Sequence, residues 1–221
     1  MLLQCETGAG NAPALAATAW LLPEMLASLC EVNEACLALL AAQAGCRAAA
    51  SPLLWQFDAL WGGLDTAARR RAASCPYLLL DAGFAEPRRW QGASAAQVGD
   101  AEGAYRGGFF TVPTAREVAR LVFTFAWHLA RSPGPAAHLL LGLPAPSALS
   151  IGQYTLPQIQ ALGESHPQWL RPRWPARVQV WRELLLAAAA GEGPALERAR
   201  LRGVPLLAAE SRLILPRPSC S

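Results

Sequence analysis

The sequence predicts an all-α fold, a helical bundle in two halves whose C-terminal half has a helix-turn-helix-like outline. Apolar residues recur every three to four positions along several segments, which is the spacing of one face of an α-helix. Thr114 and Thr155 each begin a capping-box pattern, a signature of a helix start. Residues 92–112 are rich in Gly and Ala without an apolar period. They predict a linker or long loop between a helical region at 1–91 and a helical domain at 113–221.

The composition is that of a globular protein. The chain has 221 residues, of which 53% are hydrophobic, so it can bury a sizeable core as one large or two small domains. All 19 basic residues are Arg, because Lys is absent, and 16 acidic residues leave a net charge of +3. The absence of Lys and the many Ala and Pro residues indicate a high-GC bacterial gene. This net charge predicts neither the presence nor the absence of nucleic-acid binding.

Cysteine usage favours buried free thiols over a zinc site, because no Cys-x-x-Cys pair and no histidine at ligand spacing occurs. We therefore expect no metal and no cofactor. Residues 1–5 lack the basic and apolar segments of a signal peptide, and the apolar run at 35–46 is too short to span a membrane. These features predict a cytoplasmic protein. The six cysteines are Cys5, Cys30, Cys36, Cys46, Cys75 and Cys220.

In the N-terminal region, helices are expected over 12–22 and 23–50, with Pro23 marking the restart between them. The second helix carries an apolar stripe, for which burial in the core is the favoured interpretation and a dimer seam the alternative. The stripe consists of Leu22, Leu26, Leu29, Cys36 and Leu40.

Three further segments complete this region. Ser51 followed by Pro52 predicts a third helix, with an apolar face that extends to Leu64. The triplet 69–71, all Arg, is interpreted as a solvated surface turn rather than an anion contact, because consecutive helical residues point in different directions. Residues 75–84 form a buried run whose period does not distinguish a strand from a helix.

In the C-terminal half, a helix from Thr114 is expected to stop at Ser132, and another is expected over 135–143. A brief turn of helix at 147–151, closed by Gly152, precedes the helix that starts at Thr155. At that start, Gln158 falls at the third helical position and completes the capping box, and Pro157 lies in the first turn, where no intrahelical donor is lost. A short helix, a glycine turn and a capped helix give the helix-turn-helix outline, which helical bundles also produce.

Residues 166–180 combine arginines with Trp and Pro and contain no acidic side chain. The arginines could neutralise DNA phosphates, with two polar residues at the nearby helix start contributing, or they could simply form a solvated face. The DNA-binding candidates are Arg171, Arg173, Arg177, Arg182, Thr155 and Gln158. A role in protein interaction would instead bury apolar side chains of this region against a partner helix or subunit, and the two roles can coexist. The partner-interface candidates are Trp169, Trp174, Trp181, Leu184 and Leu185.

Catalytic motifs are absent from the sequence: it has no nucleophile elbow, phosphate loop or zinc-protease motif. His128, His138 and His166 are far apart in sequence, and each is interpreted as a surface or core-edge residue rather than a catalytic base. The sequence therefore predicts no catalytic residues and a protein that is not an enzyme.

Residues 126–174 resemble FlhD, a subunit of the flagellar master transcriptional regulator of bacteria, and the similarity extends over roughly 114–190. The shared positions are Ala126, Leu129, Ala137, Leu141-Gly142-Leu143, Ala148, Thr155-Leu156-Pro157-Gln158, Leu162, Glu164 and Arg173 followed by an aromatic residue. The resemblance implies an FlhD-like domain with a C-terminal extension, which forms a homodimer and acts with an FlhC-type partner as a transcriptional activator on promoter DNA. The alternative is a non-enzymatic helical interaction protein, a scaffold or accessory subunit of a bacterial secretion or motility system, without DNA binding.

Overall fold

The computed structural model describes residues 23–46, 51–91 and 108–213, with side chains described to residue 210. Within these ranges there are two strands of two residues each, and the remaining regular structure is helical. This confirms the all-α prediction. The helix expected over 12–22 and residues 92–107 of the predicted linker lie outside the described residues.

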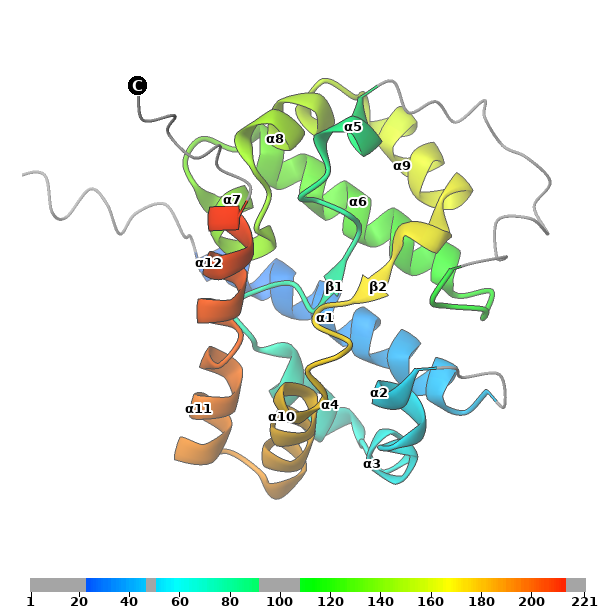
Figure 1. The fold of residues 1–221 in the computed structure, drawn as a ribbon, viewed down its shortest axis with the longest axis vertical. Coiled ribbons are helices and arrows are strands. Elements are labelled where there is room, and N and C mark those ends of the chain that lie inside the picture. The colour runs from blue at the N-terminus through cyan, green and yellow to red at the C-terminus, as the bar shows by residue number, and fades with distance from the viewer. Residues whose placement is uncertain (1–22, 47–50, 92–107, 214–221) are drawn as a thin grey trace, which may run out of the picture.

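Figure 1 shows the arrangement of the elements. The helices are α1 (Pro23–Ala44), α2 (Pro52–Trp55), α3 (Asp58–Gly62), α4 (Thr66–Ala73), α5 (Pro87–Trp90), α6 (Ala115–Arg131), α7 (Ala136–Leu141), α8 (Ala145–Gly152), α9 (Leu156–Ser165), α10 (Val178–Ala190), α11 (Pro194–Leu201) and α12 (Val204–Leu213). The strands are β1 (Leu80–Asp81) and β2 (Arg171–Pro172), and a 3-10 turn spans Pro167–Trp169.

Helix α1 runs through the middle of the molecule, between α6 above it and α4 below it in Figure 1. Its predicted apolar stripe faces the core at Leu29, Cys36 and Leu40, each at most 1% exposed, whereas Leu26 is 40% exposed. Leu22 lies outside the described residues. Core packing therefore accounts for most of the stripe, as expected for an amphipathic helix surrounded by others.

Two buried amides fix α1 against distant segments. The Asn33 side chain donates to the carbonyls of Ala73 and Tyr77, both at 3.0 Å, and accepts the Leu79 N–H at 2.9 Å. The Gln43 side chain donates to the Thr111 hydroxyl at 3.1 Å and accepts the Thr111 N–H at 2.7 Å. Because buried polar groups are stable only when they are hydrogen-bonded, these contacts determine where α1 lies along the core.

By length and composition, α1 is also apolar enough to cross a membrane, whereas the sequence was expected to hold no membrane span. In this fold the helix packs against α4 and α6. It buries the side chains of Asn33 and Gln43, each of which is hydrogen-bonded to another segment. Packing inside the protein thus accounts for the apolar residues on the buried face of the helix.

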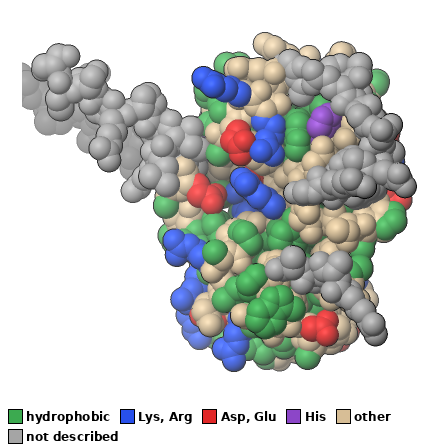
Figure 2. Space-filling model, turned by 45° about the vertical axis from the view of Figure 1, so that its right-hand side comes forward, with side chains coloured by type: hydrophobic (Ala, Val, Ile, Leu, Met, Phe, Trp, Pro, Cys, Tyr) green, Lys and Arg blue, Asp and Glu red, His purple; other side chains and the backbone are tan. Residues whose placement is uncertain are grey.

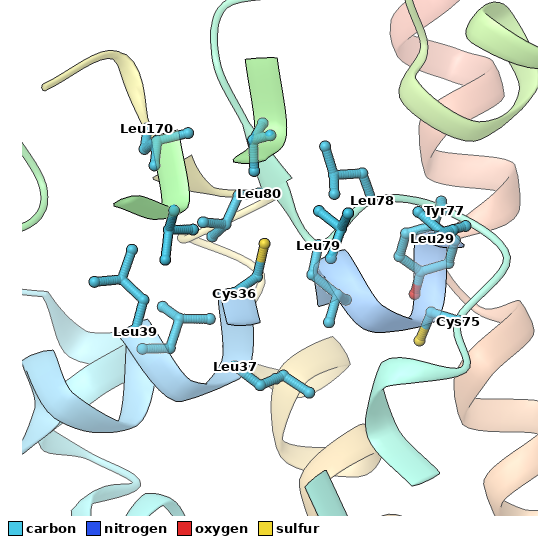
Figure 3. Close-up of a cluster of buried hydrophobic side chains, with 14 of the residues drawn as sticks. Leu29, Cys36, Leu37, Leu39, Cys75, Tyr77, Leu78, Leu79, Leu80 and Leu170 are labelled. Carbon is cyan, nitrogen blue, oxygen red and sulfur yellow. The ribbon is translucent and has the colours of Figure 1, made fainter. Parts of the chain in front are cut away.

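The segment at 75–84, which the sequence left open between strand and helix, is mostly irregular and buried. Strand β1 pairs antiparallel with β2, with Leu80 opposite Pro172 and Asp81 opposite Arg171. On either side of this pair the Leu78 N–H donates to the Leu140 carbonyl at 2.9 Å and the Arg173 N–H to the Leu79 carbonyl at 3.0 Å. Figure 3 shows the leucines of this segment lying over α1, next to its buried side chains.

The helix expected to start at Ser51 is broken into α2 and α3. Pro52 is at the first helical position as predicted, but Phe57 leaves the helical conformation and separates the two pieces. In the Arg triplet, Arg70 is exposed as expected. Arg69 instead donates to the Leu64 carbonyl at 3.2 Å, and Arg71 donates to the Ala188 carbonyl at 2.7 Å. Two of the three arginines therefore bond to backbone carbonyls, and Arg70, which is exposed on α4, lies 3.7 Å from Glu34, so only Arg70 has the solvated position that the sequence predicted.

The helix starts in the C-terminal half were predicted with mixed success. The capping box at Thr155 is present: the Gln158 side chain accepts the Thr155 N–H at 2.8 Å. The box predicted at Thr114 is wrong, because Thr114 has helical dihedral angles and the first donors of α6 bond to the backbone of Val112 and Pro113. The expected glycine cap at Gly152 is also wrong, because α8 includes this residue.

The most extensive helix packing in the described chain is between α6 and α9, and α8 packs on α6 as well. Gly163 allows the close approach: a Cβ on this residue would lie 2.7 Å from the Arg120 Cα of α6. Three residues, 153–155, connect α8 to α9. A helix pair with a short turn therefore lies across α6.

The described parts of the two predicted regions share one core. Helix α1 packs against α6, and α4 packs against α10, so elements on either side of the predicted linker are interleaved. The buried apolar side chains of both parts form a single cluster. This arrangement places the segment around β2, which contains most of the candidate arginines and tryptophans, against elements from the N-terminal region.

Candidate functional site

Arg173 is buried and forms a structural hub. Its Nε donates to the Leu78 carbonyl at 2.7 Å, its Nη2 donates to the Leu141 carbonyl, and its Nη1 lies 3.3 Å from Glu210 Oε2 of α12. The residue is 4% exposed. Burial lowers the pKa of Arg173, an effect that Asp81 and Glu210 oppose. In this fold Arg173 cannot reach a DNA phosphate, which corrects its place among the DNA-binding candidates.

Arg171 is half-exposed but paired. Its Nη2 and Nε lie 2.7 Å and 2.9 Å from Asp81 Oδ2, and Nη2 lies 3.7 Å from Glu86 Oε1. Burial on its own would raise the pKa of Asp81, but Arg173 and Arg171 outweigh it and hold that pKa below its ordinary value. The carboxylates of Asp81 and Glu86 offset the charge that Arg171 could offer to a phosphate.

The other DNA-binding candidates are exposed, but they do not form one surface. Arg177 and Arg182 lie at the start and on the outer side of α10, whereas Thr155 and Gln158 lie at the start of α9. Figure 1 places α9 at the upper right and α10 at the bottom of the molecule. The structure therefore separates the two groups that the sequence analysis had combined.

Three of the partner-interface candidates belong to the core. Trp181 and Leu184 are 2% exposed and Leu185 is 0% exposed, so none is available to a partner in this fold. The Trp181 indole N–H donates to the Arg173 carbonyl at 2.8 Å, and its ring packs 6.0 Å from that of Trp61. The apolar pattern predicted burial, but the burial is intramolecular.

The two remaining tryptophans are half-buried and also engaged. Trp174 has a left-handed backbone, φ 48°, and its indole N–H donates to Glu210 Oε1 at 2.7 Å. Trp169 packs edge-on to Trp90 at 5.4 Å, with the Arg89 guanidinium over its ring. Since a bulky residue rarely adopts positive φ, the contacts of Trp174 indicate a turn held in place by α12.

The described residues hold no cluster of three His, Cys, Asp or Glu side chains that could bind a metal ion. His128 and His138 are exposed on different helices, and His166 packs 4.5 Å from Trp169, where burial lowers its pKa. The four described cysteines are free thiols. Burial raises the pKa of Cys75 to about 12, which makes it a poor nucleophile near neutral pH. Cys5 and Cys220 lie outside the described residues.

A groove between α10 and α11 was not predicted from the sequence. It is an open surface hollow of about 450 Å³. Its lining residues are Glu183, Leu186, Ala187, Ala195, Arg198, Ala199 and Arg202. The available sequence signal was weak: Ala195 and Ala199 lie four residues apart and therefore share a helix face, but Ala is abundant throughout the chain.

The surroundings of this groove carry apolar, basic and acidic side chains, and the exposed Glu192 and Glu197 both pair with Arg200, at 3.3 Å and 2.6 Å. Leu186 is 41% exposed, and Leu201, at the end of α11, is 55% exposed. Arg202 Nη1 lies 2.6 Å from Glu183 Oε2, so this pair is internally balanced. Arg198 on α11 and Arg182, one turn before Leu186, are exposed and take part in none of the ion pairs of the described residues. Figure 2 shows basic side chains along the left of the face in view, with acidic ones between the upper members.

Comparisons with protein-family models, curated proteins and solved structures find no match to this chain.

Proposed function

We propose that the chain is a non-enzymatic helical interaction subunit that binds another protein through the α10–α11 groove. The groove carries this proposal because it combines a hollow of about 450 Å³ with an apolar wall, Leu186, which is 41% exposed. The role fits a scaffold or accessory subunit of a bacterial assembly, the alternative drawn from the sequence. It does not need Arg173 or Trp181, which are occupied within the fold.

The chemistry of the lining supports binding to a protein. The groove is shaped by small side chains from both helices, so little of it is filled. These are Ala187 on α10 and Ala195 and Ala199 on α11. A partner backbone can approach closely over such small side chains, and Leu186 offers the kind of apolar contact that stabilises a helix laid in a groove.

The test is co-expression of the chain with the products of the genes adjacent to its own. We expect a stoichiometric complex in size exclusion with light scattering. Leu186→Gln should weaken this complex by about tenfold or more, because an apolar contact is lost from the interface. Leu149→Gln is the matched control, since Leu149 is 71% exposed on α8 and lies outside the groove. Complexes that respond equally to both changes, or no complex at all, would exclude the proposal.

A second function, an FlhD-like regulator subunit acting as a dimer with an FlhC-type partner on promoter DNA, has separate support. The α8–α9 pair lies across α6 and leaves the polar side chains of Thr155 and Gln158 exposed at the start of α9, where such side chains can contact a phosphate. Arg177 and Arg182 are exposed as well. Protein binding through the groove is compatible with DNA binding at Thr155, Gln158 and Arg177, which lie outside its lining, whereas Arg182 lies beside the groove and can serve only one of the two roles at a time.

Promoter DNA binding across a series of salt concentrations tests this second function, with and without the co-expressed partner. If Arg177 and Arg182 each contact a phosphate, log K should fall less steeply with log salt after both are replaced with Ala. The magnitude of the negative slope should decrease by about two. Thr155→Ala should weaken binding with little change in this slope, since its hydroxyl carries no charge. Undetectable binding in all samples would exclude the regulator.

A further inference from the structure

We infer that the occupant of the α10–α11 groove is an acidic amphipathic helix of a partner protein. This inference rests on the proposed function and specifies the chemistry of what the site binds.

The shape of the groove favours a helix. Its walls are α10, of 13 residues, and α11, of 8 residues. At a rise of about 1.5 Å per residue, the shorter wall extends about 12 Å, which matches two turns of a partner helix. The small side chains of Ala195 and Ala199 leave room for the partner's apolar residues at helical spacing next to Leu186.

The charge of the groove selects an acidic partner. Arg198 lines it and Arg182 lies one turn from Leu186, and neither is part of an ion pair among the described residues. Glu183, the acidic residue of the lining, is already bonded to Arg202 at 2.6 Å. Carboxylates on both flanks of an incoming helix would therefore meet unpaired guanidinium groups on both walls, whereas a basic helix would be repelled. The apolar floor argues for a protein and against a nucleic acid, because bases and phosphates gain little from alanines.

Binding of designed peptides to the purified full chain tests the inference directly. The probe is a fluorescent peptide of about 18 residues, long enough to form a helix, with Leu at helical spacing on one face and Glu on its flanks. A matched peptide carries Lys in place of each Glu. Fluorescence anisotropy should show binding of the Glu peptide that weakens as salt is added, and binding of the Lys peptide weaker by about tenfold or more.

Two variants locate the binding. Ala195→Trp fills the groove and should abolish binding of the Glu peptide. Arg198→Glu should weaken binding of the Glu peptide by about tenfold or more and should strengthen binding of the Lys peptide. The controls are Ala145→Trp, at an exposed alanine of α8, and Arg88→Glu, at an exposed arginine of α5, which should both bind normally. Thermal melting of each variant identifies any that fail to fold. If Ala195→Trp fails to fold, Arg198→Glu still tests the inference, because Arg198 is exposed.

Equal binding of the two peptides, or binding unchanged by Ala195→Trp and Arg198→Glu, would overturn the inference. Displacement of the Glu peptide by a single-stranded oligonucleotide would identify the site as a nucleic-acid surface instead. If the co-expressed complex is lost on Leu186→Gln but no Glu peptide binds, the interaction subunit stands and the acidic helix is wrong. If neither forms, both proposals fail.

Discussion

At the scale of single residues, Arg173 has the most consequential environment in the chain. It joins the carbonyls of Leu78 and Leu141 and the carboxylate of Glu210, which belong to three separate segments. A buried guanidinium is stable only with such a full set of acceptors. The residue that the sequence suggested for DNA contact therefore holds the fold together.

We expect Arg173→Ala to lower the free energy of unfolding by about 2–4 kcal/mol, because it leaves two buried carbonyls without their donor and removes one of the two partners of the Glu210 carboxylate. Urea unfolding measures this loss. Arg177→Ala is the matched control, since Arg177 is exposed, and a surface substitution of this kind changes stability by about 0.5 kcal/mol or less. Similar losses in the two variants would show that the Arg173 contacts contribute little.

Asp81 predicts a pH dependence of stability. Burial alone would raise the pKa of Asp81, but the charges of Arg173 and Arg171 lower it by more. The pKa of Asp81 in the folded protein therefore lies below the ordinary value of 3.8. Because the folded pKa is depressed, the stabilisation is complete above the unfolded pKa and is lost as the pH falls through the folded pKa.

The unfolding free energy of Asp81→Asn should consequently lie below that of the wild type at neutral pH, and the two should converge as the pH falls below 3.8. Denaturant unfolding at a series of pH values measures the difference. Glu86→Gln removes a more exposed and more distant partner of Arg171, at 3.7 Å, so it should show a smaller effect at neutral pH. A difference for Asp81→Asn that does not change with pH would contradict this account.

At the scale of elements, the contact between α6 and α9 depends on one residue without a side chain. A Cβ at Gly163 would lie 2.7 Å from the Arg120 Cα and 2.8 Å from its nitrogen, which are backbone atoms that cannot move aside independently. Adding one methyl group would push apart the two helices that pack most extensively in the described chain.

Gly163→Ala should therefore destabilise the protein by about 1–3 kcal/mol, despite the usual preference of helices for Ala over Gly. Gly62→Ala is the control, because Gly62 lies in α3 and a Cβ there would have no atom within 4 Å. Its expected effect is neutral or a stabilisation of up to about 1 kcal/mol. Thermal or urea unfolding of both variants distinguishes the two cases, and a stabilising Gly163→Ala would mean that α6 and α9 can separate without loss.

At the scale of the whole molecule, predictable features were those with local causes. The capping box of Thr155 and Gln158 joins residues three apart, so the sequence contained both partners. Arg173 has its partners 32, 37 and 95 residues away, so its burial could not be read from its neighbours. The apolar pattern at Trp181 predicted burial correctly, but the pattern is the same whether the covering surface belongs to this chain or to another. The groove had no distinct signal, because its floor is made of alanines in an alanine-rich chain.

The interleaving of the two regions gives a prediction for the whole chain. If 113–221 were an independent domain, it would fold alone. In the structure, however, α6 packs against α1 and α10 packs against α4, and Arg173 needs the Leu78 carbonyl. An isolated 113–221 fragment would expose these buried faces. We therefore expect its thermal unfolding, measured by circular dichroism, to be broad and weakly cooperative, and we expect the fragment to bind a dye that reports exposed apolar surface. Adding a separately produced 1–112 fragment should restore a single cooperative transition, because it supplies the missing half of the core. A fragment that melts as sharply as the full chain would instead establish two independent domains, and the shared cluster would then be an interface between them.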